Sequence, residues 1–326
     1  MWFEALTGFR EETADQVRSN LRVDGDTMTS SVNGRTMICG RLETPTLADL
    51  RSRIHEIDAP KGELTLSEVV GDVQLLHKNP ANAGALFQVA SQFNLLEMVA
   101  PSYTPEDGID IYERDRTQGP ACAIACGAGT IYRQYLTDVN GQVGQTADNQ
   151  IDCLADLGDA LDNTDERLWT MQNGYALASA AGLREITDRL LTASESERDT
   201  LRKKLRIGVQ WGTQVTLGNV GHQVSQAFCS ALPVAYSSHS DELWEEFAKL
   251  VLEASYESTI CAAVLNSVST GSNKVFLTLL GGGAFGNCED WILSAIQRAL
   301  HEYRDCGLDV MFVSYGTSNP SIQAMI

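Results

Sequence analysis

The chain has 326 residues, 43% of them hydrophobic, and a net charge of −19 from 43 acidic and 24 basic residues. This length suffices for one large domain or two ordinary ones with a sizeable core. The acidic balance argues against nucleic acid as a partner because phosphate contacts need a basic face, and no apolar run reaches membrane-spanning length. The first residues, Met1 to Leu6, form no basic leader, so we expect a cytoplasmic protein.

The cysteines and histidines predict no metal centre. Only Cys122 and Cys126 lie close together, in an apolar segment without a second pair or a nearby histidine, which is a poor zinc pattern. The other cysteines are scattered, as expected for small buried residues in a reducing compartment. We therefore expect no metal and no cofactor.

The first part of the chain predicts a short helix, a strand and a longer helix. Thr46 is a suitable N-cap for the short helix. Apolar residues within 64–78 predict a buried strand, the polar residues 79–84 a turn, and residues 86–98 a helix. Residues 101–120 have a loop-like composition.

The second half alternates between helical and extended patterns. Residues 150–205 are expected to be mostly helical, with a capping box from Ser194 to Glu197. Further helices are expected over 242–265 and around Trp291 to Leu300. The remaining apolar segments predict strands at 207–212, 228–236, 275–278 and 308–315.

This alternation predicts an α/β fold. We expect residues 1–60 to form an N-terminal extension that packs on a main domain of residues 61–326.

The segment most informative about function is the glycine turn between the strand at 275–278 and the helix that follows it. Its sequence is Gly281, Gly282, Gly283, Ala284, Phe285, Gly286 and Asn287. Residues without a Cβ let backbone N–H groups approach a phosphate, and the helix adds the positive end of its dipole. The segment therefore predicts a diphosphate-binding loop, although a tight turn without a ligand is an equal alternative.

Two known phosphate motifs do not explain this turn. No Gly-Lys-Ser/Thr follows the glycines, which excludes the P-loop pattern. The spacing Gly-x-Gly-x-x-Gly is present, but the next strand ends at Tyr315 without the acidic residue that binds a nucleotide ribose.

Several segments resemble macrodomains, the ADP-ribose-binding fold. Residues 79–84, Asn-Pro-Ala-Asn-Ala-Gly, are similar to the Asn-Ala-Ala-Asn region of that fold, and the glycine turn resembles its diphosphate loop in the form found in poly(ADP-ribose) glycohydrolases. Residues 87–97, 117–122 and 208–214 resemble the macrodomain-like ADP-ribosyl-ubiquitin hydrolases of the MavL type. The resemblance covers about residues 65–316 and implies a macrodomain-like mixed sheet flanked by helices, with N-terminal and helical additions.

The resemblance also implies a ligand site. The turn from Gly281 to Asn287 would hold the diphosphate of ADP-ribose, and Asn79 and Asn82 would bind the distal ribose. Gln92 lies in a region comparable with the ligand-binding part of the family. Phe285 would contact the adenine or its ribose, or else pack in the core beneath the turn. The two asparagines would equally suit a turn without a ligand.

Cleavage of an ADP-ribosyl bond needs a carboxylate that stabilises an oxocarbenium-like centre or activates water. The candidates are Glu97, Asp107 and Asp115, the last two in the loop-like segment. The paired glutamates of the glycohydrolase signature are absent near the first turn. Each candidate is alternatively a solvated charge, and Asp115 an ion-pair partner of its neighbouring arginines.

Three functions follow from these patterns. The first is a hydrolase that removes ADP-ribose from a modified protein, for which the resemblance suggests ubiquitin. The second is a reader that binds ADP-ribose without cleaving it. The third is a structural α/β protein with no nucleotide ligand.

Overall fold

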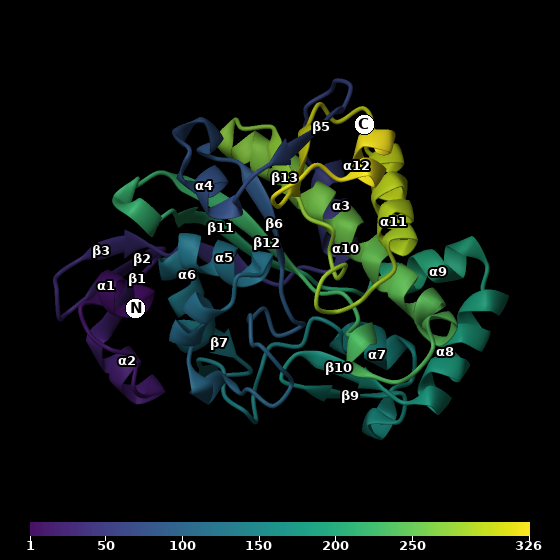
Figure 1. Ribbon diagram of the computed structural model, residues 1–326, viewed down its shortest axis with the longest axis horizontal. Helices are drawn as coiled ribbons and strands as arrows, with labels where there is room; N and C mark the ends of the chain where they lie inside the picture. Colours follow the sequence, from purple (N-terminus) through teal and green to yellow (C-terminus); the bar gives the residue numbers. More distant parts are fainter.

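The computed structural model describes residues 1–326 and is built around a mixed sheet of seven strands (Figure 1). The strand order is β4-β11-β12-β6-β13-β14-β5. The pairs from β12 to β5 are all parallel, whereas β11 runs antiparallel to both its neighbours. This is the predicted α/β architecture, a mixed sheet flanked by helices. The strands of the sheet are β4 (Arg41–Glu43), β5 (Thr65–Val70), β6 (Leu86–Ala90), β11 (Gly208–Gln214), β12 (Gln223–Cys229), β13 (Lys274–Leu277) and β14 (Asp309–Ser314).

Helices cover both faces of this sheet (Figure 1). The long helix α10 packs against β6, β12 and β13 on one face, with α3, α8, α9 and α11 around it, whereas α4, α5 and α6 lie on the other face. The helices are α1 (Trp2–Thr7), α2 (Ala14–Asn20), α3 (Leu47–His55), α4 (Val73–Lys78), α5 (Gln118–Ala125), α6 (Gly127–Ile131), α7 (Ala155–Ala160), α8 (Ala180–Thr192), α9 (Glu195–Arg202), α10 (Asp241–Thr270), α11 (Glu289–Glu302) and α12 (Pro320–Met325).

Local sequence explains several element boundaries. Thr46 and Ser194 form capping boxes with Asp49 and Glu197, which satisfy the first N–H groups of α3 and α9. Helix α10 ends at Thr270 and is capped by Gly271, whose φ of 77° is the left-handed conformation that glycine adopts without strain.

Residues 1–40 form a small unit beside the sheet. Strands β1 (Leu21–Asp24), β2 (Thr27–Ser30) and β3 (Thr36–Ile38) make an antiparallel sheet that packs, with α1 and α2, on residues 96–135. The carboxylate of Glu11 ties this unit to the rest of the protein: it accepts bonds from the Ile109 N–H (3.0 Å), the Asp110 N–H (2.7 Å) and the Tyr135 hydroxyl (2.6 Å). The next strand, β4, joins the main sheet, and the domain boundary at residue 60 stays a prediction.

Three predicted elements differ from the structure. Residues 86–98 form β6 and a loop instead of a helix, because a fully buried strand lacks the alternation that distinguishes it from a helix. The predicted strand at 64–78 is β5 followed by helix α4, which Asp72 caps. The strand predicted at 228–236 lies earlier, at 223–229, and Pro233 follows it.

Within the segment expected to be mostly helical, a hairpin of β9 (Trp169–Gln172) and β10 (Tyr175–Ala178) separates the helices. The hairpin turn contains Asn173 and Gly174, both with positive φ. A second short hairpin is formed by β7 (Asp138–Val139) and β8 (Gln142–Val143).

All eight cysteines are free, and all except the half-buried Cys288 are buried. None of the helices is both long enough and apolar enough to cross a bilayer.

Candidate functional site

The candidate site lies at the carboxyl edge of the parallel strands, where β6 and β13 separate. These strands pair only at Leu86 and Phe87. Farther along, Gln118 at the start of α5 takes the place of β13: its side-chain amide donates to the Gln88 carbonyl (2.7 Å) and accepts from the Ala90 N–H (2.9 Å). Loops at such a separation are the usual ligand-binding place in open α/β sheets. We call the surrounding loops, residues 91–98, 230–236 and 278–288 with the start of α5, the carboxyl-edge site.

The glycine turn offers unpaired backbone donors at this site. Within residues 278–288 the N–H groups of Gly282, Gly286 and Asn287 bond to carbonyls of the same loop. In contrast, the N–H groups of Gly283, Ala284 and Phe285 donate to no protein atom. Gly283 and Ala284 are exposed. Consecutive free N–H groups ahead of a helix favour an anion.

Tight packing fixes the shape of this turn. The Nδ2 of the buried Asn287 donates to the Leu232 carbonyl at 2.8 Å, which joins the turn to the loop after β12. Gly281 has a φ of 78°, and a Cβ there would clash with the Cβ of Ala231 and lie 2.7 Å from Nδ2 of Asn287. The hydroxyl of Tyr256 on α10 bonds the Thr278 carbonyl and the Leu280 N–H. The N–H donors are therefore held in place without a ligand.

Three aromatic rings adjoin the turn. The ring centroid of Phe285 lies 5.3 Å from that of Tyr175 and 5.6 Å from that of Tyr236, and the two tyrosine rings are 5.1 Å apart. Phe285 is only partly buried and Tyr236 is 36% exposed. Phe285 thus belongs to a partly exposed aromatic cluster, which provides flat apolar surface next to the N–H donors.

Hydrogen bonds join the two ends of the loop after β6, residues 91–98, which lies beside this cluster. The side chain of Gln92 accepts from the Met98 N–H (2.9 Å) and donates to the Met98 carbonyl (3.1 Å), and the Tyr175 hydroxyl donates to the same carbonyl (2.6 Å). Gln92 is buried, and its amide groups are engaged in these bonds. The structure therefore places Gln92 at the carboxyl-edge site as a residue that shapes the loop.

Glu97 lies in the same loop, next to the first turn of α5. Its side chain is 3% exposed, one carboxylate oxygen has no hydrogen-bond partner, and the other abuts Gly119. Burial raises the pKa of Glu97 well above its usual range; the positive charge of Arg133 opposes this rise and the negative charge of Asp115 adds to it. A buried, unpartnered carboxyl group of this kind is characteristic of a functional site.

Arg133 holds this loop through a hydrogen bond to its backbone. Its Nε donates to the Leu95 carbonyl at 2.5 Å, and its guanidinium lies 3.8 Å from the ring centroid of Phe228. Leu95 has a φ of 65°, a strained conformation for a residue with a side chain. The two terminal nitrogens of Arg133 are buried without a partner. The arginine therefore stabilises the bend that brings Glu97 to the start of α5.

The two loop aspartates have similar local roles but different positions. A carboxylate oxygen of the half-buried Asp115 accepts from the Thr117 N–H at 2.8 Å, immediately before α5. Burial is the main cause of the raised pKa values of Glu97 and Tyr175, and the negative charge of Asp115 adds to both. The exposed Asp107 accepts from the Thr104 N–H at 2.8 Å and caps a separate short turn. Of the two, only Asp115 borders the carboxyl-edge site.

The structure separates Asn79 and Asn82 from the other candidates. Both precede β6, whereas the glycine turn follows β13, which is parallel to β6, so they lie at opposite edges of the sheet. Asn79 caps a short turn, and Asn82 donates to the Leu76 carbonyl and accepts from Lys274. The expectation that this turn and the glycine turn form one ligand site is therefore wrong.

Comparisons with known proteins give distant structural similarity. No protein-family model and no curated protein matches the sequence. Among solved structures, the poly(ADP-ribose) glycohydrolase of Thermomonospora curvata is 11% identical with a TM-score of 0.47, covering 99% of this chain and 97% of its own. That of Deinococcus radiodurans in complex with ADP-ribose is 9% identical with a TM-score of 0.46, covering 96% and 94%. These values are too low to transfer an activity or a residue's role.

Three residues that form or contact the carboxyl-edge site were assigned no role from the sequence: Gln118, Arg133 and Tyr175. Gln118 lies in the segment 117–122, which carries the family resemblance, so its position held a signal. The contributions of Arg133 and Tyr175 depend on contacts with residues far away in the chain. No local pattern could have indicated them.

Proposed function

We propose that the protein is a hydrolase that removes ADP-ribose from a modified protein. The observation that carries this proposal is the row of free N–H groups from Gly283 to Phe285 beside an aromatic cluster and next to the Glu97 loop. The N–H groups suit a diphosphate, and the aromatic cluster suits an adenine or ribose. The sequence resemblance to macrodomain hydrolases supports the same ligand.

The proposed reaction exchanges one bond at the distal ribose. Water attacks the anomeric carbon, the bond to the acceptor side chain breaks, and the proton of water ends on the leaving group. Asp115 is the proposed catalytic carboxylate, which stabilises the positive charge or activates the water. Glu97 is proposed as a positioning residue, because its side chain is only 3% exposed and lies against Gly119 at the start of α5.

Asp115→Asn tests this assignment, with Asp107→Asn as a matched control. Asparagine retains an oxygen that accepts the N–H bond of the cap, so both variants should fold. We expect Asp115→Asn to lose at least 100-fold in turnover of an ADP-ribosylated protein while still binding ADP-ribose, a loss typical of removing acid–base catalysis. Asp107→Asn should match the wild type. Equal losses in both variants would remove Asp115 from the mechanism.

The second candidate function is a reader that binds ADP-ribose without cleaving it. The burial of Glu97 favours it, since the only carboxylate of residues 91–98 is 3% exposed. Calorimetry with ADP-ribose and a turnover assay, both on the wild type, distinguish the two functions. Binding without turnover establishes the reader, and absence of binding removes both.

The acceptor protein is a separate part of the proposal. We propose ubiquitin as the first acceptor to test, because residues 87–97, 117–122 and 208–214 resemble the ubiquitin-specific hydrolases. Comparing turnover of ADP-ribosylated ubiquitin with that of another ADP-ribosylated protein tests this choice independently of the hydrolase activity.

A further inference from the structure

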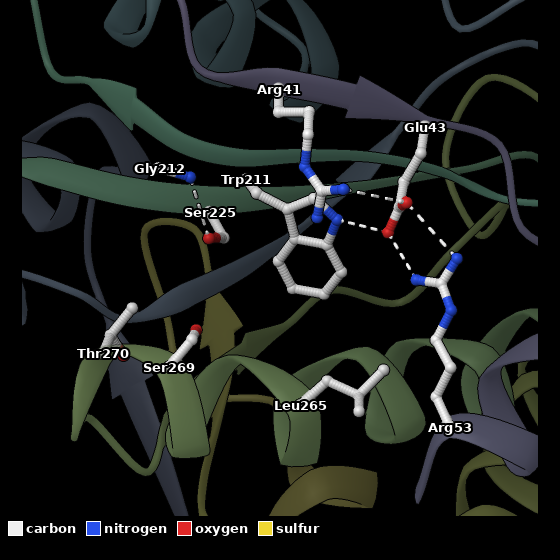
Figure 2. A pocket seen from close by; sticks show the side chains of 9 residues that line it. All are labelled: Arg41, Glu43, Arg53, Trp211, Gly212, Ser225, Leu265, Ser269 and Thr270. Atoms are coloured by element: carbon white, nitrogen blue, oxygen red, sulfur yellow. Dashed lines mark hydrogen bonds and ion pairs between the residues drawn. The ribbon is translucent and has the colours of Figure 1, made fainter. Parts of the chain in front are cut away.

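A cavity of about 370 Å³ lies between the sheet and the end of α10, away from the carboxyl-edge site. Its walls come from β4, β11, β12, α3 and the last turns of α10 (Figure 2). Ser225 in its wall is near the amino end of β12, whereas the carboxyl-edge site begins after the last residue of that strand. The volume falls within the range of small-molecule sites.

A β-bulge directs an aromatic side chain into this cavity. The register between β11 and β12 shifts between Gln210 and Thr213, and Gly212 has a φ of 62°. Bulges commonly redirect a side chain in this way. The indole of Trp211 points from the sheet toward Leu265 on α10 (Figure 2) and is only partly buried.

One end of the cavity has an excess positive charge. The carboxylate of Glu43 accepts from Nε1 of Trp211 (2.6 Å) and from Arg53 (2.6 Å). Burial opposes the charge of Glu43, but the bonds from Arg53 and Trp211 outweigh it and hold its pKa below the usual value. Arg41 lies 3.7 Å from Glu43 and makes no hydrogen bond. Two guanidinium groups therefore share one carboxylate, in a chain with a net charge of −19.

The other end of the cavity is formed by the last turn of α10. Ser269 and Thr270 line it, and the helix ends at Thr270. The carboxyl end of a helix carries partial negative charge and favours hydrogen-bond donors. The cavity is therefore polarised, with a site for an acidic group at Arg41, a flat ring surface at Trp211, and a site for a donor group at α10.

We propose that this cavity binds a nucleoside monophosphate whose base carries an amino group. The phosphate would pair with Arg41, the base would lie on Trp211 and Leu265, and the amino group would face the end of α10. Guanidinium–phosphate hydrogen bonds and base–aromatic stacking are the interactions that recognise such a ligand. The proposal does not depend on the hydrolase function, because no residue of the carboxyl-edge site lines the cavity.

Calorimetry with AMP as the probe tests the proposal on the full-length protein. The variants are Arg41→Gln and Trp211→Leu, and the matched control is Arg22→Gln, which removes an exposed arginine of β1 that does not line the cavity. Arg41 is 71% exposed and makes no hydrogen bond, so its replacement should leave the fold unchanged. Gly283→Glu blocks the carboxyl-edge site, which is the alternative place for AMP to bind as a fragment of ADP-ribose.

We expect AMP to bind the wild type, Arg22→Gln and Gly283→Glu equally, and to bind Arg41→Gln and Trp211→Leu at least tenfold more weakly. Adenosine and inorganic phosphate should each bind more weakly than AMP, and IMP, which lacks the amino group, more weakly as well. Absence of AMP binding at millimolar concentration would overturn the proposal. If Gly283→Glu abolishes AMP binding and Arg41→Gln retains it, then AMP binds at the carboxyl-edge site, and the proposal is again overturned.

Discussion

The sharpest prediction concerns two glycines of the same turn, Gly281 and Gly283. In Gly281→Ala the new Cβ would meet Ala231 and Asn287, at a φ of 78° that an alanine adopts only with strain. The left-handed conformation costs about 1–2 kcal/mol, and overpacking about 1–3 kcal/mol. We therefore expect Gly281→Ala to lower the free energy of unfolding by about 2–5 kcal/mol, the sum of these two effects.

Gly283→Ala is the matched control. It has no atom within 4 Å of the added Cβ and no positive φ, so the change in unfolding free energy should be within about 0.5 kcal/mol, as for an exposed surface position. Urea denaturation of both variants, with the wild type, gives the two values directly. If Gly281→Ala costs less than about 1 kcal/mol, or if the two variants are equally destabilised, then the turn is not rigidly held and the packing argument is refuted.

Three further predictions follow from the site. Glu97→Gln removes a carboxyl group whose pKa is raised in the folded protein. Below the pKa of the unfolded chain, Glu97 is protonated in both the folded and the unfolded wild type; above it, only the unfolded chain releases the proton. The free energy of unfolding of the wild type should therefore fall by about 1.4 kcal/mol per pH unit relative to the variant, until the pKa of the folded protein is reached. Urea denaturation at pH 5 and pH 8 measures this, and a constant difference between the two proteins would contradict it. Gln118→Leu leaves the Gln88 carbonyl and the Ala90 N–H without partners and should lower the free energy of unfolding by about 1–3 kcal/mol. The backbone N–H of Ala90 should then lose protection from hydrogen exchange. Unchanged exchange there would show that water or another group replaces the side-chain amide of Gln118. Asn82→Ala should leave ADP-ribose affinity within twofold of the wild type by calorimetry, since Asn82 lies at the other edge of the sheet, and a tenfold loss would show that this assignment of the edges is wrong.

The sequence predicted the fold best where elements have their own boundary signals. The N-cap at Thr46 and the capping box at Ser194 predicted the starts of α3 and α9, and the strand, glycine turn and helix around Gly281 were all found in the expected order. These features depend on residues within four positions of one another, so their chemistry is visible in a single sequence.

The sequence predicted the secondary structure less well where a strand is buried on both faces and shows no alternation of apolar and polar residues. β6 is buried on both faces, so its apolar residues show no strand periodicity and were assigned to a helix. The ligand site was displaced for another reason: Asn79 and Asn82 were assigned to it from the resemblance of residues 79–84 to the Asn-Ala-Ala-Asn region. Once residues 86–90 form a strand, the loop that reaches the site is the one after it, with Glu97.

The bonds of Glu11 have a consequence for how Asp115 is positioned. Glu11 holds Ile109 and Asp110, a few residues before Asp115, through two backbone N–H groups. Local unfolding of residues 1–40 would release both bonds and free the segment that leads to Asp115. Each loss of about 1.4 kcal/mol in the local unfolding free energy would raise the population of this open form tenfold. A substitution far from the ligand, in the small N-terminal sheet, would then reduce the fraction of molecules with an ordered site while the main sheet stays folded.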